Sequence, residues 1–223
     1  RRKTFLFSAS KIPKRKKIAL TLGANSSPID DIRSIVNRSS GNTGWSISEY
    51  LYRMGHDVIC IAGNTSATPG FKLPDVRHCA SPEEMLNEAK KVSMEESPDV
   101  WIFSAAVLDY VPEVIAGKIP SGDTNISISL VPTKKHIPEI LTNTEGCISI
   151  GFKLESNIGY PELIDKARLQ MDRYSLDSVV ANRLQDLDDP DAPRCWLVDS
   201  NGSTTEIASL QSLCLKIEEY ISS

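Results

Sequence analysis

The chain has 223 residues and a mass of 24.5 kDa, enough for one large domain or two small ones. Its 40% hydrophobic and 24% charged residues are ordinary for a globular protein and exclude a collagen-like, mucin-like or fully disordered chain. No apolar run approaches the ~20 residues of a membrane span, so the sequence also excludes an integral membrane protein.

The net charge of −4 is unevenly distributed. Residues 1–17 hold eight Lys or Arg and no acid, so the rest of the chain carries 17 bases against 29 acids. An acidic body argues against nucleic-acid binding, which needs a basic footprint. We interpret residues 1–16 as a basic tail or linker, with a nucleic-acid or membrane tail and a transit segment as alternatives, and residues 17–223 as the domain.

The first half of the chain alternates short apolar strands with amphipathic helices. Strands are predicted over residues 17–22, 57–62 and 99–104. Helices are predicted around residues 45–54 and after Ser81, where a serine cap, a proline and two glutamates mark a helix start. The strands show no polar alternation, which is typical of a parallel sheet buried on both faces.

The second half contains a segment of another kind. Residues 125–131 alternate apolar and polar side chains, which predicts a half-exposed strand in an antiparallel flap or edge. A hairpin is predicted around Asn201-Gly202. The other predicted elements are strands over 147–152, 177–181, 195–199 and 204–207 and helices over 137–141, 161–174 and 210–221. The whole is predicted to be one α/β domain with an inserted flap.

Ligands bind beyond the carboxyl ends of the strands in an open parallel sheet, so the residues that follow each strand are the first candidates. Small and polar residues occupy these positions, as in the runs 23–26 and 104–109. Neither GxGxxG nor the Walker GxxxxGK[ST] pattern occurs. The string Ser-Ser-Gly-Asn-Thr-Gly at residues 39–44 precedes a helix and suits an anion, although a simple capping loop is an equal interpretation.

The five cysteines are odd in number, scattered and without a CxxC pair. This usage indicates reduced thiols in a reducing compartment and no zinc site. The three histidines, His56, His78 and His136, are interpreted as surface residues, and no Ser/His/Asp set stands out.

The string Pro-Ile-Asp-Asp-Ile-Arg-Ser-Ile-Val-Asn-Arg-Ser-Ser-Gly-Asn-Thr-Gly at residues 28–44 closely resembles the phosphopantothenoylcysteine synthetase family of coenzyme A biosynthesis. Further strings match that family in the same order: Ser-Ala-Ala-Val-Leu-Asp-Tyr at 104–110, Gly-Lys-Ile at 117–119, Gly-Phe-Lys-Leu-Glu at 151–155 and Val-Val-Ala-Asn at 179–182. The resemblance covers residues 17–222. It implies an α/β fold with a Rossmann-like, mostly parallel three-layer sheet and an inserted antiparallel flap used in dimerisation.

The resemblance implies a ligase that joins 4′-phosphopantothenate and L-cysteine into 4′-phosphopantothenoylcysteine. Members of the family activate the carboxylate as an acyl-nucleotide, using CTP or ATP with Mg²⁺ and releasing pyrophosphate. The cysteine amine then displaces the nucleoside monophosphate. The expected partners are small-molecule substrates and a second copy in a homodimer, with no nucleic acid and no membrane, and the expected location is cytoplasmic.

The same motifs imply the site residues. Asn37 is the expected catalytic amide, donating to the oxyanion of the second step, and Lys118 the expected catalytic ammonium at the nucleotide's α-phosphate. The expected nucleotide-binding residues are Gly23, Asp109, Lys118 and Phe152, with Asp109 also the metal ligand. The expected substrate-binding residues are Ser39, Ser40, Gly41, Gly44, Ala105 and Ala106.

The sequence departs from the family pattern at several points. Gly23-Ala24-Asn25 replaces Gly-Gly-Thr, and Gln170 and Tyr174 stand where many bacterial members carry nucleotide-contacting lysines. The choice between CTP and ATP therefore stays open. Two other classes remain as alternatives: a Rossmann-like dinucleotide-dependent reductase, which the missing GxGxxG disfavours, and a non-catalytic binding module of the same fold.

Overall fold

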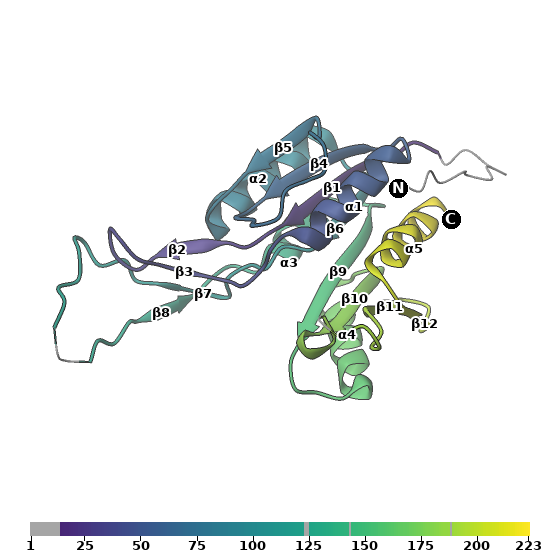
Figure 1. Ribbon diagram of the computed structural model, residues 1–223. Helices are drawn as coiled ribbons and strands as arrows, with labels where there is room; N and C mark the ends of the chain where they lie inside the picture. The colour runs from purple at the N-terminus through teal and green to yellow at the C-terminus, as the bar shows by residue number, and fades with distance from the viewer. Residues whose placement is uncertain (1–13, 123–124, 143, 188) are drawn as a thin grey trace.

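A computed structural model describes residues 14–122, 125–142, 144–187 and 189–223 (Figure 1). Its centre is an eight-stranded sheet in the order β12-β11-β10-β9-β6-β1-β4-β5. All pairings from β10 to β5 are parallel, whereas β11 runs back against β10 and the hairpin returns along β12. The strands are β1 (Lys17–Leu22), β4 (Asp57–Ala62), β5 (Asp75–His78), β6 (Val100–Phe103), β9 (Ile148–Glu155), β10 (Ser178–Arg183), β11 (Cys195–Asp199) and β12 (Thr204–Ile207).

Helices cover both faces of this sheet, so the molecule has three layers (Figure 1). α1 and α5 pack on one face, and α2, α3 and α4 pack on the other. Because successive strand residues point to opposite faces, Leu20 of β1 enters the first core and Ala19 the second. The helices are α1 (Asn42–Arg53), α2 (Pro82–Glu96), α3 (His136–Leu141), α4 (Tyr160–Tyr174) and α5 (Leu210–Ser222), with a 3₁₀ turn at Leu184–Asp186. The predicted α/β fold with a mostly parallel three-layer sheet is confirmed.

Local sequence signals account for the helix starts. The Ser81 hydroxyl accepts from the Glu84 N–H at 3.1 Å, the Glu84 carboxylate accepts from the Ser81 N–H at 3.1 Å, and Pro82 is the first residue of α2. This capping box satisfies backbone donors that the first turn of a helix would otherwise leave unpaired. α4 begins with proline in its first turn and buries Leu163, Ala167 and Met171 along one face.

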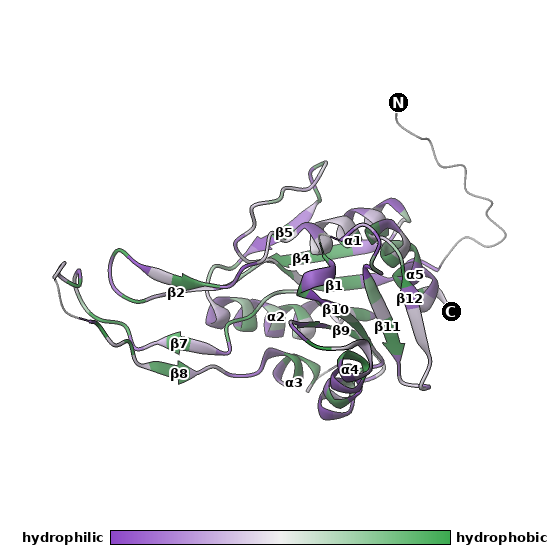
Figure 2. Cartoon of the chain, turned by 60° about the horizontal axis from the view of Figure 1, so that its bottom comes forward, coloured by the Kyte–Doolittle hydropathy of each residue, from purple (hydrophilic) through white to green (hydrophobic). Residues whose placement is uncertain are grey.

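Two antiparallel ribbons project from the body (Figures 1 and 2). β2 (Ser26–Pro28) pairs with β3 (Ser34–Val36), and β7 (Tyr110–Pro112) pairs with β8 (Leu130–Pro132). We call residues 26–36 and 110–132 the extension; residues 123–124 within it lie outside the described part. The ribbon of β7 and β8 corresponds to the predicted flap, whereas the ribbon of β2 and β3 was not predicted. The strand predicted over residues 125–131 was wrong in extent. Residues 125–129 form no strand and are exposed, so their alternation does not report a buried face.

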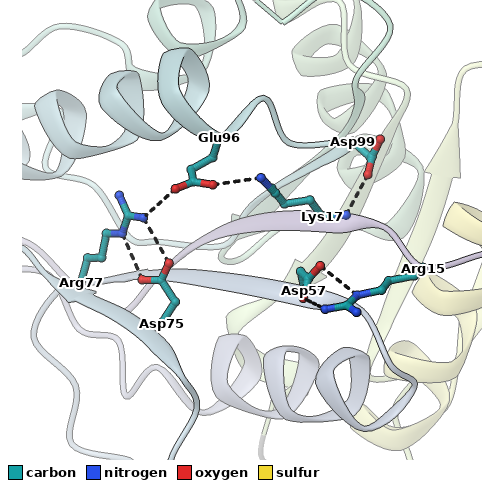
Figure 3. Close-up of polar contacts among 7 residues, drawn as sticks. All are labelled: Arg15, Lys17, Asp57, Asp75, Arg77, Glu96 and Asp99. Atoms are coloured by element: carbon teal, nitrogen blue, oxygen red, sulfur yellow. Dashed lines mark hydrogen bonds and ion pairs between the residues drawn. The ribbon is translucent and has the colours of Figure 1, made fainter.

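Paired charges close the edge of the sheet where the parallel strands begin (Figure 3). The ion pairs there are Arg15–Asp57, Lys17–Glu96, Arg77–Asp75 and Arg77–Glu96. The Lys17 N–H also donates to the Asp99 carboxylate at 2.7 Å. Residues 1–13 of the predicted basic tail lie outside the described residues, so the boundary at residue 17 stays a prediction.

Two histidines predicted to lie on the surface are buried, so that prediction was wrong. His56 lies beside α5, with Nε2 2.8 Å from a Glu218 carboxylate oxygen and Nδ1 accepting from the Lys16 N–H at 3.1 Å. His136 is buried at the first residue of α3. Both ring nitrogens of His56 have partners, which allows that ring to be buried and which a lone histidine in a sequence does not reveal. His78 is exposed, as predicted.

All five cysteines have free thiols. Burial raises the pKa of Cys60 and Cys79 to about 11, and the pKa of Cys147, Cys195 and Cys214 to about 12. Since the thiolate is the reactive form, these side chains act as small apolar groups. Among the described residues, no helix has both the length and the apolarity needed to cross a bilayer.

Candidate active site

A cavity of about 1440 Å³ opens at the edge of the sheet where the parallel strands end. Its wall includes Gly23 after β1, Ala105, Ala106 and Asp109 after β6, and Phe152 on β9. Ser39, Ser40, Gly41 and Gly44 line it at the start of α1. The structure therefore brings nine of the eleven sequence-predicted site residues to a single cavity, at the edge where an open parallel sheet usually binds its ligand. The other two are Asn37 and Lys118.

The glycines of the 39–44 loop are required by close packing. Gly41, the N-cap of α1, has φ 79, and an added Cβ would lie 2.5 Å from the Thr65 side chain. A Cβ on Gly44 would lie 2.4 Å from the Leu22 Cβ, because α1 packs directly on β1. The first turn of α1 carries no acidic residue. The positive end of the helix dipole and the free backbone N–H groups of the first turn therefore lie at the cavity, and no carboxylate of that turn competes for them.

Asn37 lies against the cavity wall without lining the cavity. Its side-chain amide donates to the Ala106 carbonyl at 3.1 Å, and its backbone N–H donates to the Asn25 carbonyl at 3.4 Å. The Ala106 N–H in turn donates to the Gly23 carbonyl at 2.8 Å. These bonds tie the loops after β1 and β6 together, and they place Asn37 next to its cavity-lining neighbours Arg38 and Ala106.

Asp109 faces the opening beside Lys135. The Lys135 ammonium donates to the Asp109 carboxylate at 2.6 Å, both side chains are exposed, and this bond raises the pKa of Lys135. Mg²⁺ is usually held by one or two carboxylates together with substrate phosphates, so a single exposed carboxylate fits a magnesium ion that arrives on a polyphosphate. Within the described residues, no three His, Cys, Asp or Glu side chains cluster as a preformed metal cage.

The cavity is strongly basic although the chain is acidic. Seven Lys or Arg side chains line it against three Asp or Glu. The cations are Arg38, Lys134, Lys135, Lys153, Lys166, Arg173 and Arg194, and the carboxylates are Asp109, Glu155 and Asp172. Lys153 and Lys166 both contact Glu155, at 2.8 and 3.1 Å, which lowers the pKa of that carboxyl group. A concave surface with this excess of cations concentrates anions.

The helix α4 supplies the remaining wall. Gln170 donates its side-chain amide to the Phe152 carbonyl at 3.3 Å, so its amide N–H group is engaged with the backbone of β9. Lys166 and Arg173 on the same helix line the cavity. The positive charge that the family's lysines would provide at positions 170 and 174 is thus present elsewhere on this helix.

Lys118 does not line the cavity. It is exposed in the extension, between Gly117, whose carbonyl accepts from the Asp31 N–H at 3.3 Å, and Ile119. The Ile119 N–H donates to the buried Asp30 carboxylate at 3.0 Å, and this bond is the main cause of the lowered pKa of Asp30. Asp30 also pairs with Arg33 at 2.5 Å. Lys118 therefore lies in the extension and outside the cavity that Asp109 lines, and its role stays a prediction.

Several residues that line the cavity were not among the predicted site residues, and Arg194 and His136 are two of them. Arg194 precedes β11 and His136 begins α3, and both line the wall. Neither follows a parallel strand, so the strand-end rule did not point to them. The signal that could have marked Arg194 is the predicted hairpin, because the first residue of a strand that runs antiparallel lies at the edge where its parallel neighbours end.

A family model described as DNA/pantothenate metabolism flavoprotein C-terminal domain matches residues 14–219 of the chain. The "Coenzyme A biosynthesis bifunctional protein CoaBC" of Thermococcus kodakarensis is 35% identical over 171 residues, which cover 76% of this chain and 42% of that protein. The chain thus spans less than half the length of this relative.

Solved structures with a similar fold include proteins of pantothenate metabolism. The DNA/pantothenate metabolism flavoprotein of Streptococcus pneumoniae superposes with a TM-score of 0.80 at 26% identity, covering 92% of this chain and 99% of the other. A mutant of Cab2 in complex with phosphopantothenate-cysteine superposes with a TM-score of 0.75 at 19% identity, covering 92% and 87% of the two chains. At 19% identity, the similarity to Cab2 shows a shared fold.

Proposed function

The chain belongs to the family of DNA/pantothenate metabolism flavoprotein C-terminal domains, and from that premise we propose that it is a phosphopantothenate–cysteine ligase. It joins 4′-phosphopantothenate and L-cysteine through an acyl-nucleotide, with CTP or ATP as co-substrate. The observation that carries the proposal is the basic cavity at the strand ends, where seven cations face three carboxylates and the family's motifs meet.

The charge of the cavity suits the first step. Both reactants are anions, so their meeting requires neutralisation. An oxygen of the pantothenate carboxylate attacks the α-phosphorus, a C–O–P link forms, and the bond to the β-phosphate oxygen breaks to release pyrophosphate. Asp109 would hold Mg²⁺, which would supply charge neutralisation for this step. The start of α1 and the cavity cations hold phosphate oxygens, while Lys118 serves the α-phosphate.

Asn37 serves the second step. The cysteine nitrogen attacks the acyl carbon, the C–N bond forms, the C–O bond to the nucleotide breaks, and the ammonium proton leaves to solvent. The carbonyl oxygen becomes an oxyanion during the attack. The Asn37 amide, 3.1 Å from the Ala106 carbonyl at the cavity wall, is a non-titrating donor that can turn toward that oxygen.

A homodimer is part of the proposal, because the extension exposes apolar side chains that a lone chain would leave in water. Six of them are at least 48% exposed: Ile32, Val36, Tyr110, Val114, Ile126 and Leu130. Hydrophobic segments run along both ribbons in Figure 2. A second copy that covers this face brings its own Lys118 to the first copy, which would resolve the separation of Lys118 from the cavity. A cytoplasmic location accords with five unpaired thiols.

The activity assay supplies 4′-phosphopantothenate, L-cysteine, Mg²⁺ and either CTP or ATP in parallel reactions. Pyrophosphate and the cysteine amide are expected in equal amounts with at least one nucleotide. Neither product with either nucleotide would contradict the proposal. Hydride transfer from a nicotinamide cofactor under matched conditions would favour the reductase alternative.

A mixing experiment tests whether two chains share each site. Asn37→Ala and Lys118→Ala homodimers are each expected to be nearly inactive. Unfolded together and refolded, half of the dimers become mixed, and one site in each mixed dimer then has both native residues if the residues come from different chains. Activity should recover to about a quarter of wild type. No recovery in dimers shown to be mixed would place both residues in one chain.

A further inference from the structure

We propose that Arg194 is a phosphate-binding residue that acts together with the start of α1. The inference rests on the proposed function, and it names a side chain to which neither the motifs nor the relatives assign a role. The ligand chemistry is a phosphate group, carried by the nucleoside triphosphate or by 4′-phosphopantothenate.

The topology brings Arg194 to the cavity. β11 runs antiparallel to β10, with Trp196 opposite Ala181 and Asp199 opposite Ser178. The start of β11 therefore lies at the same sheet edge as the end of β10. Arg194, one residue before the strand, lines the cavity beside the start of α1. A cation thus approaches this helix start from a distant part of the sequence.

The side-chain contact defines the direction of the guanidinium. Its Nη2 donates to the Thr43 hydroxyl at 3.0 Å, across 151 positions of sequence, and the side chain is partly buried. Thr43 is the second residue of α1, so the guanidinium lies beside the first backbone N–H groups of that helix. Guanidinium and helix dipole both favour negative charge at this place.

The charge of Arg194 is not neutralised by a carboxylate in the described part of the chain. Its side chain donates to the neutral Thr43 hydroxyl, whereas Arg183, on the neighbouring strand, holds Asp186 with two hydrogen bonds of 2.7 and 2.8 Å. An arginine that only fastens a hairpin gains more from a carboxylate than from a hydroxyl. The Arg194 guanidinium donates to one neutral hydroxyl and lines a basic cavity. It therefore keeps N–H groups that can bind a phosphate with two hydrogen bonds.

The test measures binding rather than turnover. Wild type, Arg194→Gln and Arg194→Lys are titrated separately with CTP, ATP, pyrophosphate and 4′-phosphopantothenate by calorimetry. Arg194→Gln should weaken binding of at least one of these by roughly ten- to hundredfold, and Arg194→Lys by less, because it keeps the charge and loses the fork. The matched control is Arg168→Gln on α4, where Arg168 lies 3.7 Å from Asp165 and outside the cavity lining.

The pattern of loss identifies the ligand. A loss with the nucleotides and pyrophosphate assigns Arg194 to the triphosphate, and a loss confined to 4′-phosphopantothenate assigns it to that phosphate. Unchanged affinities in a folded Arg194→Gln would overturn the inference and leave the proposed function standing, whereas wild type that binds none of the four would contradict the function itself. If Arg194→Gln does not fold, the Arg194→Lys titration decides, with wild-type affinity for all four ligands counting against the inference.

Discussion

The two edges of the central sheet use charge in opposite ways. Where the parallel strands begin, the cations of Figure 3 lie against carboxylates. Arg77 by itself contacts three carboxylates, those of Asp75, Glu88 and Glu96. Where the strands end, the cavity holds more than twice as many cations as carboxylates. At the first edge, carboxylates of the chain itself balance these cations. At the second edge, a bound anion would balance the excess positive charge.

We infer from this difference that charges at the first edge serve stability and charges at the second edge serve ligand binding. Paired charges at the first edge contribute to folding, to the modest degree that partly exposed ion pairs allow. Unpaired cations at the second edge repel one another, so the folded chain tolerates them at a cost in stability that a ligand can repay. Substitutions at the cavity should therefore reduce activity and leave the fold intact, whereas substitutions at the other edge should do the reverse.

The largest effect is expected at Asn37. Asn37→Ala removes the proposed oxyanion donor, and the rate of amide formation should fall by roughly 10²–10³. Pyrophosphate release in the first turnover should persist, so the acyl-nucleotide accumulates. Quenched-flow assays of both products measure the two steps, and thermal unfolding should show little change.

Asn87→Ala provides the control, since Asn87 is exposed on α2 and distant in sequence from every motif. It removes the same amide and should leave both steps unchanged. Full turnover by Asn37→Ala would remove Asn37 from the mechanism and weaken the assignment of function to this edge.

Most of the body was predictable because its signals are local. The strand predicted over residues 17–22 has the bounds of β1, and the hairpin predicted around Asn201-Gly202 has the bounds of β11 and β12. Buried apolar runs and turn residues determine these bounds with little help from distant contacts. The motif-based family assignment is likewise confirmed, because it depends on the order of strings along the chain.

The extension and part of the site were not predictable, because they depend on contacts between distant segments. Ser26–Pro28 has no strand signal and forms β2 because β3 lies opposite. Lys118 belongs to a recognised motif, yet its neighbour Ile119 contacts Asp30 within the extension and Lys118 does not line the cavity. Arg194 precedes an antiparallel strand, where a rule built on parallel strands does not look.

The next largest effect is a dependence of stability on pH at His136, which lines the cavity. Burial lowers its pKa from 6.5 to about 4, so the ring is neutral at the basic edge and adds no charge there. The unfolded chain takes up a proton near pH 6.5 and the folded chain near pH 4, so stability is present above pH 6.5 and is lost as the pH falls toward 4. At pH 5 this loss is about 2 kcal/mol.

Urea unfolding of wild type and His136→Gln at pH 7.5 and pH 5 measures this loss. The decrease in unfolding free energy between the two pH values should be smaller in the variant by about that amount. His78→Gln, which changes an exposed ring, should retain the wild-type decrease. Equal decreases in all three proteins would show that His136 titrates normally in the folded state.

The smallest effect is expected at the opposite edge. Arg77 is 22% exposed and joins β5 to α2 through Glu88 and Glu96, at 2.8 and 3.6 Å, while it also contacts Asp75 of its own strand at 3.0 Å. Arg77→Gln leaves this cluster of carboxylates without its central cation, and the free energy of unfolding should fall by about 1 kcal/mol. Arg168→Gln breaks a single exposed pair and should cost less than about 0.5 kcal/mol. Ligand affinity and turnover should match wild type in both variants, because neither arginine lines the cavity. A loss of phosphate affinity in Arg77→Gln without a loss of stability would mean that the two edges are coupled through the sheet.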